Sequence, residues 1–303
     1  MRIVSLIPSA TEILFAVGAG DDVVGVTFEC DHPPAARERR IVSTSAMPEG
    51  LAPREIDDFV AAATRAGDDL YRLDAGALAE IDADLVVTQD LCAVCAIDVG
   101  TVDEALSYLG CRAEVATLDP HTLDDVLDTI TEVGRLTGYA TEAEEVVASF
   151  RARLAAVAAR VEGRDRPRVL VLEWTDPPYS PGHWIPEMVD LAGGIPSLGV
   201  AGTRSSRITW DDATASRPDV VVCAPCGYDV EGSAALAEDV REHFPGTPVW
   251  AVDADGLFAR PGPRLVEGIE VLAGILHPDP DPDPDPEVSA AGVDEHLRLR
   301  RLP

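Results

Sequence analysis

Short apolar runs alternate with segments of helical periodicity along the first 120 residues. Runs at 2–7, 23–27 and 84–89 predict strands, and weaker ones are expected near Leu70 and over 112–117. Helices are expected between them, from about residue 8, residue 53 and residue 99. Strands that alternate with helices in this way favour a mostly parallel sheet covered by helices.

The stretch PSATEILFAVG, residues 8–18, carries the signals of a helix start and stop. Ser9 is expected as the N-cap, and Glu12 three residues later would complete a capping box. Gly18 would end the helix.

From residue 121 to residue 163 the pattern becomes purely helical. Apolar residues recur at spacings of three and four up to Leu136, and a second run continues from Val146 to Val161. That second run is near 20 residues, so it would be about 30 Å long at 1.5 Å per residue. A helix of this length can join two lobes.

Strand patterns resume over 168–174, 219–224 and 249–253, and a closing helix is expected from Pro263 to His277. The predicted fold class is therefore α/β, with two parallel-sheet, Rossmann-like lobes joined by one long α-helix and a ligand cleft between the lobes. The predicted boundaries are 1–120, 121–163 for the helical segment, and 164–277. Residues 278–303, with the repeat PDPDPDPDP, are expected to be a disordered acidic tail.

Four of the six cysteines follow predicted strands. Cys30, Cys92, Cys95 and Cys226 are expected on loops at the carboxyl ends of strands, where open parallel sheets bind ligands. Cys111 precedes a strand, and Cys223 lies within one and is expected in the core.

Several roles for these cysteines stay open. Four thiolates in one cleft would suit zinc or an iron–sulfur cluster. Cysteine is also a small apolar residue that fills tight turns. A thioredoxin-like redox role is less favoured, because the loop after Cys95 continues to Asp98 before a helix is expected.

Aromatic residues gather near strand ends in the second lobe, although only 5% of the chain is aromatic. Tyr179, Trp184 and Trp210 could stack on a flat ligand, and Trp174 lies close by in sequence. Trp174 and Trp184 could instead be core residues, and Trp210 could be a hydrophobic staple ahead of a helix. Arg260 precedes the last helix, whose N-terminus would help it to bind an anionic group.

Composition narrows the classes of function. The net charge is −30, and all 24 basic residues are arginine, so binding to nucleic acid or to anionic lipid is not expected. Such an acidic surface is typical of a protein that stays hydrated in concentrated salt. No segment reaches the roughly 18 apolar residues of a membrane span, and the start lacks a secretory signal pattern, so a cytoplasmic protein is expected.

Catalytic motifs are missing from the sequence. The six histidines show no HExxH spacing, and there is no GxSxG, no GxGxxG after a strand and no P-loop. A protein that is not an enzyme is expected.

Four stretches together resemble a family: RIVSLIPSATEILFAVGAGDDVVGVTFECDHPP, VLEWTDPPYSPGHWIPEMVDLAGG, RITWDDATASRPDVVVCAPCG and LFARPGPRLVEGIEVLAGILHP. They resemble the substrate-binding proteins of cobalamin and iron–siderophore ABC importers, known as helical-backbone metal receptors, over about residues 1–277. The match is greatest to a subgroup of cobalamin-binding proteins that commonly lack a secretion signal. The resemblance implies two lobes, one long connecting helix and a ligand held between the lobes.

The resemblance also implies ligand contacts. Tyr179, Trp210 and Arg260 fall where the family contacts its ligand. In the first lobe Glu29, Ser45 and Gln89 stand where the cobalamin binders have aromatic rings, so that half of the platform is missing, and Cys30, Cys92 and Cys95 stand nearby.

Two functional hypotheses follow. The leading one is non-catalytic binding of a corrinoid such as cobalamin, or of another metal chelate, with an ABC importer permease as partner. The alternative is an intracellular metalloprotein that holds zinc or an iron–sulfur cluster on Cys30, Cys92, Cys95 and Cys226. A transport role would place the protein outside the cell, tethered to the membrane, and would require a start codon upstream of Met1.

Overall fold

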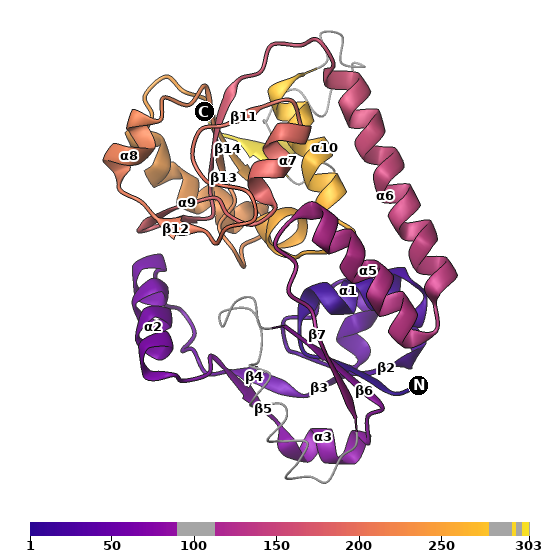
Figure 1. The fold of residues 1–303 in the computed structure, drawn as a ribbon. Helices are drawn as coiled ribbons and strands as arrows, with labels where there is room; N and C mark the ends of the chain where they lie inside the picture. The colour runs from indigo at the N-terminus through magenta and orange to yellow at the C-terminus, as the bar shows by residue number, and fades with distance from the viewer. Residues whose placement is uncertain (90–112, 279–292, 295–298, 303) are drawn as a thin grey trace. The chain divides into compact units, whose positions relative to one another are not determined.

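The computed structural model describes residues 1–89, 113–278, 293–294 and 299–302 (Figure 1). The chain divides into two compact units. Unit 1 contains Met1–Pro120 and Asp124–Ser149, and unit 2 contains His121–Leu123 and Phe150–Pro303. The expected helix at about residue 99, together with Cys92, Cys95 and Cys111, lies outside the described residues. Each unit is an α/β fold built on a largely parallel sheet, as the apolar runs predict.

Unit 1 is built on a five-stranded sheet, which we call sheet A, with strand order β3-β2-β1-β6-β7. All four strand pairs are parallel, and Ile3 of β1 lies between Val23 of β2 and Leu85 of β6. The elements of unit 1 are β1 (Ile3–Ser5), α1 (Pro8–Ala16), η1 (Ala19–Asp22), β2 (Val23–Val26), η2 (Pro34–Glu38), β3 (Arg40–Ile41), β4 (Ser43–Ser45), α2 (Pro53–Ala66), β5 (Tyr71–Leu73), α3 (Ala75–Ile81), β6 (Leu85–Thr88), β7 (Glu114–Thr117), most of α5 (Leu123–Thr137) and the first half of α6 (Ala140–Val161).

The central strands of sheet A, β1, β2 and β6, are short, mainly apolar and almost completely buried. Leu85, Val86 and Val87 of β6 are each nearly inaccessible to solvent, and Leu78 of α3 packs into the same core as Val86. This is the continuous hydrophobic pattern that parallel sheets show when helices cover their faces.

The N-cap of helix α1 lies two residues earlier than its sequence signals predict. Pro8 is its first residue, and the N-cap position is taken by Ile7, which makes no side-chain cap. The prediction of Ser9 as N-cap is therefore wrong. The reason is that Pro8 fits the first helical position, where its fixed φ suits the helix and its missing N–H is not needed.

Unit 2 is built on sheet C, with strand order β11-β8-β13-β14-β16-β15. Strands β11, β8, β13 and β14 are parallel, and α9 packs on β13 and β14 (Figure 1). The elements of unit 2 are the second half of α6, β8 (Arg168–Leu172), β9 (Trp174–Thr175), β10 (Pro178–Ser180), α7 (Ile185–Leu191), β11 (Ile195–Pro196), β12 (Ser206–Arg207), α8 (Trp210–Ala215), β13 (Val220–Cys223), α9 (Val230–His243), β14 (Val249–Val252), a π-helical turn η3 (Asp255–Ala259), α10 (Leu265–Leu276), β15 (Val293–Asp294) and β16 (Leu299–Arg301).

Residues 299–301 form strand β16 of sheet C, between β14 and β15, which corrects the expectation of a disordered tail for these residues. Strand β16 pairs antiparallel with β14, so that Val252 lies opposite Leu299. Leu299 and Leu302 are buried, and Leu302 joins the core that includes Val249. The guanidinium of Arg301 lies 5.9 Å from the ring of Trp250. The sequence analysis did not predict this strand, because Leu299 and Leu302 come after a long Asp–Pro repeat whose composition is typical of a disordered segment.

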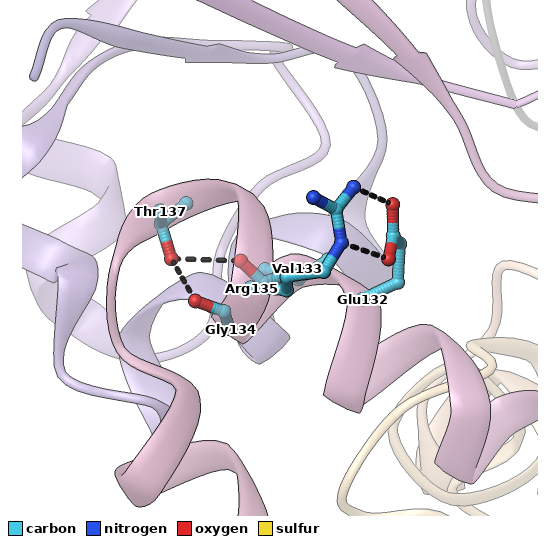
Figure 2. A network of polar contacts seen from close by, with 5 residues as sticks. All are labelled: Glu132, Val133, Gly134, Arg135 and Thr137. Carbon is cyan, nitrogen blue, oxygen red and sulfur yellow. Dashed lines mark hydrogen bonds and ion pairs between the residues drawn. The ribbon is translucent and has the colours of Figure 1, made fainter.

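The junction of α5 and α6 depends on a small residue. Figure 2 shows the last turns of α5, where Arg135 donates to both carboxylate oxygens of Glu132 and Thr137 Oγ1 lies 2.7 Å from the carbonyl oxygen of Val133. The hydrogen bond to Arg135 lowers the pKa of Glu132. Because this ion pair is exposed, it contributes little to the stability of the folded protein. Gly134 is buried, and a Cβ at this position would overlap the Cβ of Ala143 in α6.

We expect Gly134→Ala to destabilise the protein by about 1–3 kcal/mol, because the added methyl must displace α6 and would also lie 2.8 Å from the carbonyl oxygen of Tyr139. Gly274→Ala is the matched control. Gly274 is an exposed position in α10 with no neighbour within 4 Å, so this change should stabilise by up to about 1 kcal/mol through helix propensity. Urea unfolding of both variants measures the difference, and equal effects would contradict the packing account.

Candidate functional site

The carboxyl ends of sheet C carry three aromatic residues, Trp174, Tyr179 and Tyr228, which we call the aromatic ridge. The strand order places β11 on one side of β8 and β13 on the other, so the chain changes direction across the sheet between β8 and β13. Ligands of open α/β sheets bind at such a switch point, outside the carboxyl ends of the strands. Trp174 follows β8 and Tyr228 follows β13, and both are half-buried.

The members of the aromatic ridge contact one another. The rings of Trp174 and Tyr228 lie 5.7 Å apart between centroids and are tilted by 57°. Tyr179 lies directly opposite Trp174 in the β9–β10 pair, so the two side chains project from the same face of that small sheet. Burial raises the pKa of Tyr228, which keeps its phenol neutral. The ridge can therefore offer uncharged aromatic surface to a flat ligand.

Hydrogen bonds hold the backbone around the ridge in place. The indole N–H of Trp174 donates to the carbonyl oxygen of Asp176 at 3.1 Å, and the backbone N–H of Cys226 donates to the carbonyl oxygen of Glu173 at 3.2 Å. The backbone N–H of Asp255 donates to the carbonyl oxygen of Tyr228. The loops that follow β8, β13 and β14 are thus joined into one edge.

Arg260 lies at the same edge, after the π-helical turn that follows β14. Its side chain is 8% exposed and forms an ion pair with Asp255. Turns of π-helix occur often at functional sites. The pair places a guanidinium and a carboxylate together, so this part of the edge carries little net charge.

Trp184 and Trp210, which the sequence analysis predicts as ligand contacts, both pack against other residues of unit 2. Trp184 is 4% exposed, and its indole N–H donates to the carbonyl oxygen of Phe258 at 2.8 Å. One face of Trp210 stacks on His243, with 3.9 Å between ring centroids and 5° between planes, and Phe244 meets it edge-on. Trp184 therefore has the surroundings of a core residue, and Trp210 has one face covered within unit 2.

The predicted first-lobe residues lie at or near the carboxyl edge of sheet A. Gln89 is buried directly after β6, and Ser45 ends β4. Glu29 follows β2 and accepts a hydrogen bond of 2.7 Å from the hydroxyl of Tyr71. Their roles as ligand contacts stay predictions.

The described cysteines have different surroundings. Cys30 is 3% exposed, and its Sγ lies 2.9 Å from Thr11 Oγ1, which in turn lies 2.8 Å from Ser5 Oγ. Cys223 is fully buried, which raises the pKa of its thiol and confirms the expectation of a core residue. Cys226 is half-buried on the loop after β13.

A metal centre receives no support from the described part of the chain. Among these residues, no group of three or more His, Cys, Asp and Glu side chains could hold a metal ion. Cys92 and Cys95 lie outside the described residues, so the four-cysteine site with Cys30 and Cys226 stays a prediction.

The sequence analysis does not include Tyr228 among the candidate site residues. Its position in PCGYD, on the loop that follows the buried strand β13, is the signal that could have identified it. A hollow of about 320 Å³ lies elsewhere in unit 2, lined by Arg168, Ala215, Ser216 and Arg217. Arg168 begins β8, so this hollow lies at the opposite end of that strand from the ridge.

A histidine pair lies in the same unit. The rings of His121 and His183 are 5.9 Å apart, and Nε2 of His183 is buried without a hydrogen-bond partner. His183 also has a left-handed φ of 48°. Burial lowers the pKa of His183, and the charges of His121 and Arg204 lower it further.

We expect His183 to make folding depend on pH. Because its pKa is lower in the folded protein than the ordinary value of about 6.5, the unfolded chain binds the proton first, and stability is lost as pH falls through that value. His183→Asn suits the left-handed backbone and removes the titrating group. Between about pH 7.5 and pH 5.5, the free energy of unfolding should fall more steeply for the natural chain than for the variant. Equal slopes for the two proteins would exclude this role of His183.

Known proteins are similar to this chain in sequence and in fold. The model of the family described as "Periplasmic binding protein" matches residues 3–254. The "Uncharacterized ABC transporter substrate-binding lipoprotein YvrC" of Bacillus subtilis is 26% identical over 297 residues, which covers 92% of this chain and 80% of the relative. A "Cobalamin-binding protein" of Halobacterium salinarum is 26% identical over 290 residues, covering 91% of this chain and 69% of the relative.

Solved structures agree on the fold. A periplasmic heme-binding protein from Pseudomonas aeruginosa superposes with a TM-score of 0.67 at 19% identity, covering 92% of this chain and 93% of the other. Among the described residues, no helix is both long and apolar enough to cross a membrane. The expectation of a cytoplasmic protein is not supported by relatives described as periplasmic or as a lipoprotein. The family model spans most of both units, and the two α/β units have the architecture that the resemblance implied: the chain belongs to the periplasmic binding protein family.

Proposed function

We propose that this protein binds a corrinoid, with cobalamin as the first candidate, and delivers it to an ABC importer permease without chemical change. The observation that carries the proposal is the aromatic ridge at the switch point of sheet C. The proposal places the protein outside the cytoplasmic membrane, where an importer's receptor meets its ligand.

The chemistry of the ridge suits a large flat ring. Trp174 and Tyr228 are each only half-buried, although they already touch, so part of each ring remains accessible. Aromatic contacts of this kind contribute about 0.5–1.5 kcal/mol each beyond the area that they bury. Several such contacts are needed to hold a ligand at the low concentrations at which a receptor works.

Arg260 is proposed as the polar contact beside the ridge. Its ion pair with Asp255 fixes the guanidinium after β14, and the backbone hydrogen bond from Asp255 to Tyr228 connects it to the ridge. A guanidinium already paired with a carboxylate suits a neutral polar group, such as an amide, better than it suits a second negative charge.

The relatives support the ligand and the partner. The Halobacterium relative is named a cobalamin-binding protein, and the Bacillus relative is named an ABC transporter substrate-binding lipoprotein. Both alignments cover more than nine tenths of this chain. These names favour a corrinoid as ligand and a permease as partner.

Titration calorimetry with cyanocobalamin tests the proposal. The natural chain should bind with a Kd of about 1 µM or tighter. Trp174→Ala and Tyr228→Ala should each weaken binding by about tenfold, because each removes a stacking face.

Trp250→Phe is the matched control. Trp250 lies within β14 beneath Arg301, away from the ridge in sequence and structure, so this variant should bind as the natural chain does. No binding heat from the natural chain at a concentration of about 100 µM would contradict the proposed function.

A further inference from the structure

Glu173 lies between β8 and β9, where the chain leaves sheet C and enters the hairpin that carries Trp174 and Tyr179. Its side chain is half-buried, and the residue before it, Leu172, is fully buried. A carboxylate in such a position costs free energy unless hydrogen bonds offset the loss of water. The hydrogen-bond partners of Glu173 therefore indicate what its carboxylate contributes.

The carboxylate of Glu173 holds the loop that precedes α7. Its Oε1 accepts a hydrogen bond of 2.6 Å from the backbone N–H of Gly182, which is buried. A hydrogen bond to a charged acceptor is about twice as strong as one between neutral groups. This bond fixes the loop to the start of the hairpin.

The loop around Gly182 packs in turn against residues 203–205. A Cβ at Gly182 would lie 2.2 Å from the backbone nitrogen of Ser205, so the two backbones are in close contact. Residues 203–205 lead into β12, which pairs with β10 at Tyr179. The bond from Glu173 to Gly182 therefore also supports Tyr179 from the side of β12.

The backbone of Glu173 contacts two further parts of the aromatic ridge. Its N–H donates to the carbonyl oxygen of Tyr179 at 3.3 Å, and its carbonyl oxygen accepts from the N–H of Cys226 at 3.2 Å. Cys226 lies two residues before Tyr228, on the loop after β13. The hydrogen bonds of the side chain and the backbone thus reach each segment from which a ring of the ridge projects.

We propose that Glu173 is the positioning residue of the aromatic ridge. It acts through the hairpin and the two loops to which it is bound, and it makes no contact with the ligand itself. Rings that are already held in the binding arrangement lose less conformational freedom when a ligand binds, so the affinity is higher. This inference rests on the proposed function and adds a residue on which that function depends.

Titration calorimetry of the full chain with cyanocobalamin tests this role. Glu173→Ala should weaken binding by about tenfold, because the rings are no longer held in one arrangement. Glu173→Gln keeps an oxygen that accepts from Gly182, so its affinity should stay within about threefold of that of the natural chain. A loss in Glu173→Gln as large as that in Glu173→Ala would overturn the inference.

A double variant separates positioning from a direct contact with the ligand. If Glu173 acts through the ridge, the chain with both Glu173→Ala and Trp174→Ala should bind about tenfold more weakly than the natural chain. Two independent contacts would instead multiply to a loss of about a hundredfold, and that result would overturn the positioning role.

Asp219→Ala is the matched control. Asp219 Oδ2 accepts a hydrogen bond of 2.8 Å from the backbone N–H of Arg168, at the opposite end of β8. This variant also removes a carboxylate that accepts from the backbone of unit 2, so it should lower stability but bind cyanocobalamin as the natural chain does. Equal weakening by Asp219→Ala and Glu173→Ala would show a general effect of stability and would overturn the inference.

Amide hydrogen exchange of the ligand-free chain tests the positioning without the ligand. Exchange at residues 182–183 and 203–206 should be faster in Glu173→Ala than in the natural chain. Unchanged exchange there would overturn the positioning role and leave the proposed function standing. Faster exchange, together with no binding of cyanocobalamin by the natural chain, would overturn the proposed function and with it the role of Glu173 in binding.

Discussion

Burial of the parallel strands is the constraint on which the rest of the structure depends. The strands β1, β6, β8 and β13 are covered on both faces, and nearly all of their side chains are inaccessible to solvent. Helical crossovers occupy the faces of such sheets, so only the ends of the strands can meet a ligand. Polar and aromatic side chains accordingly collect after β2 and β6 in unit 1 and after β8, β13 and β14 in unit 2.

The carboxyl edges of the two sheets are built differently. In unit 1 small hydroxyl groups fill the space beneath the edge: Ser43 Oγ lies 2.7 Å from Thr27 Oγ1, and Thr11 connects Ser5 with Cys30. These buried groups satisfy one another, as buried polar groups must. In unit 2 the edge is held mainly by backbone hydrogen bonds between loops and by the Arg260–Asp255 pair. Both arrangements fix the loops from which aromatic rings project.

The sequence predicts the elements that repeat with a clear period. The buried runs at 23–27, 84–89, 219–224 and 249–253 all contain strands, and the helical spacing up to Val161 corresponds to α5 and α6. Short elements were missed. Strands of two or three residues, such as β9, β10 and β12, are too short to show an alternation of apolar and polar residues. Strand β16 forms because it can pair with β14, and its own sequence pattern does not predict it.

The site could be predicted only in part. Strand ends directed attention to Tyr179, Arg260 and Glu29, because parallel topology determines at which edge of a sheet the loops can meet a ligand. Neither Trp210 stacking on His243 nor the Phe28–Tyr71 pair could be predicted, since each contact joins residues more than 30 positions apart. A contact between distant segments leaves no periodic signal in one sequence.

Hydrogen–deuterium exchange of the full chain, with and without cyanocobalamin, tests most directly whether the carboxyl edges bind the ligand. The account predicts slower exchange on binding in the loops at 27–32, 173–183, 225–229 and 253–261, with little change in β11 or at the amino end of β8. Binding that slows exchange at the amino ends of the strands and leaves those loops unchanged would contradict it.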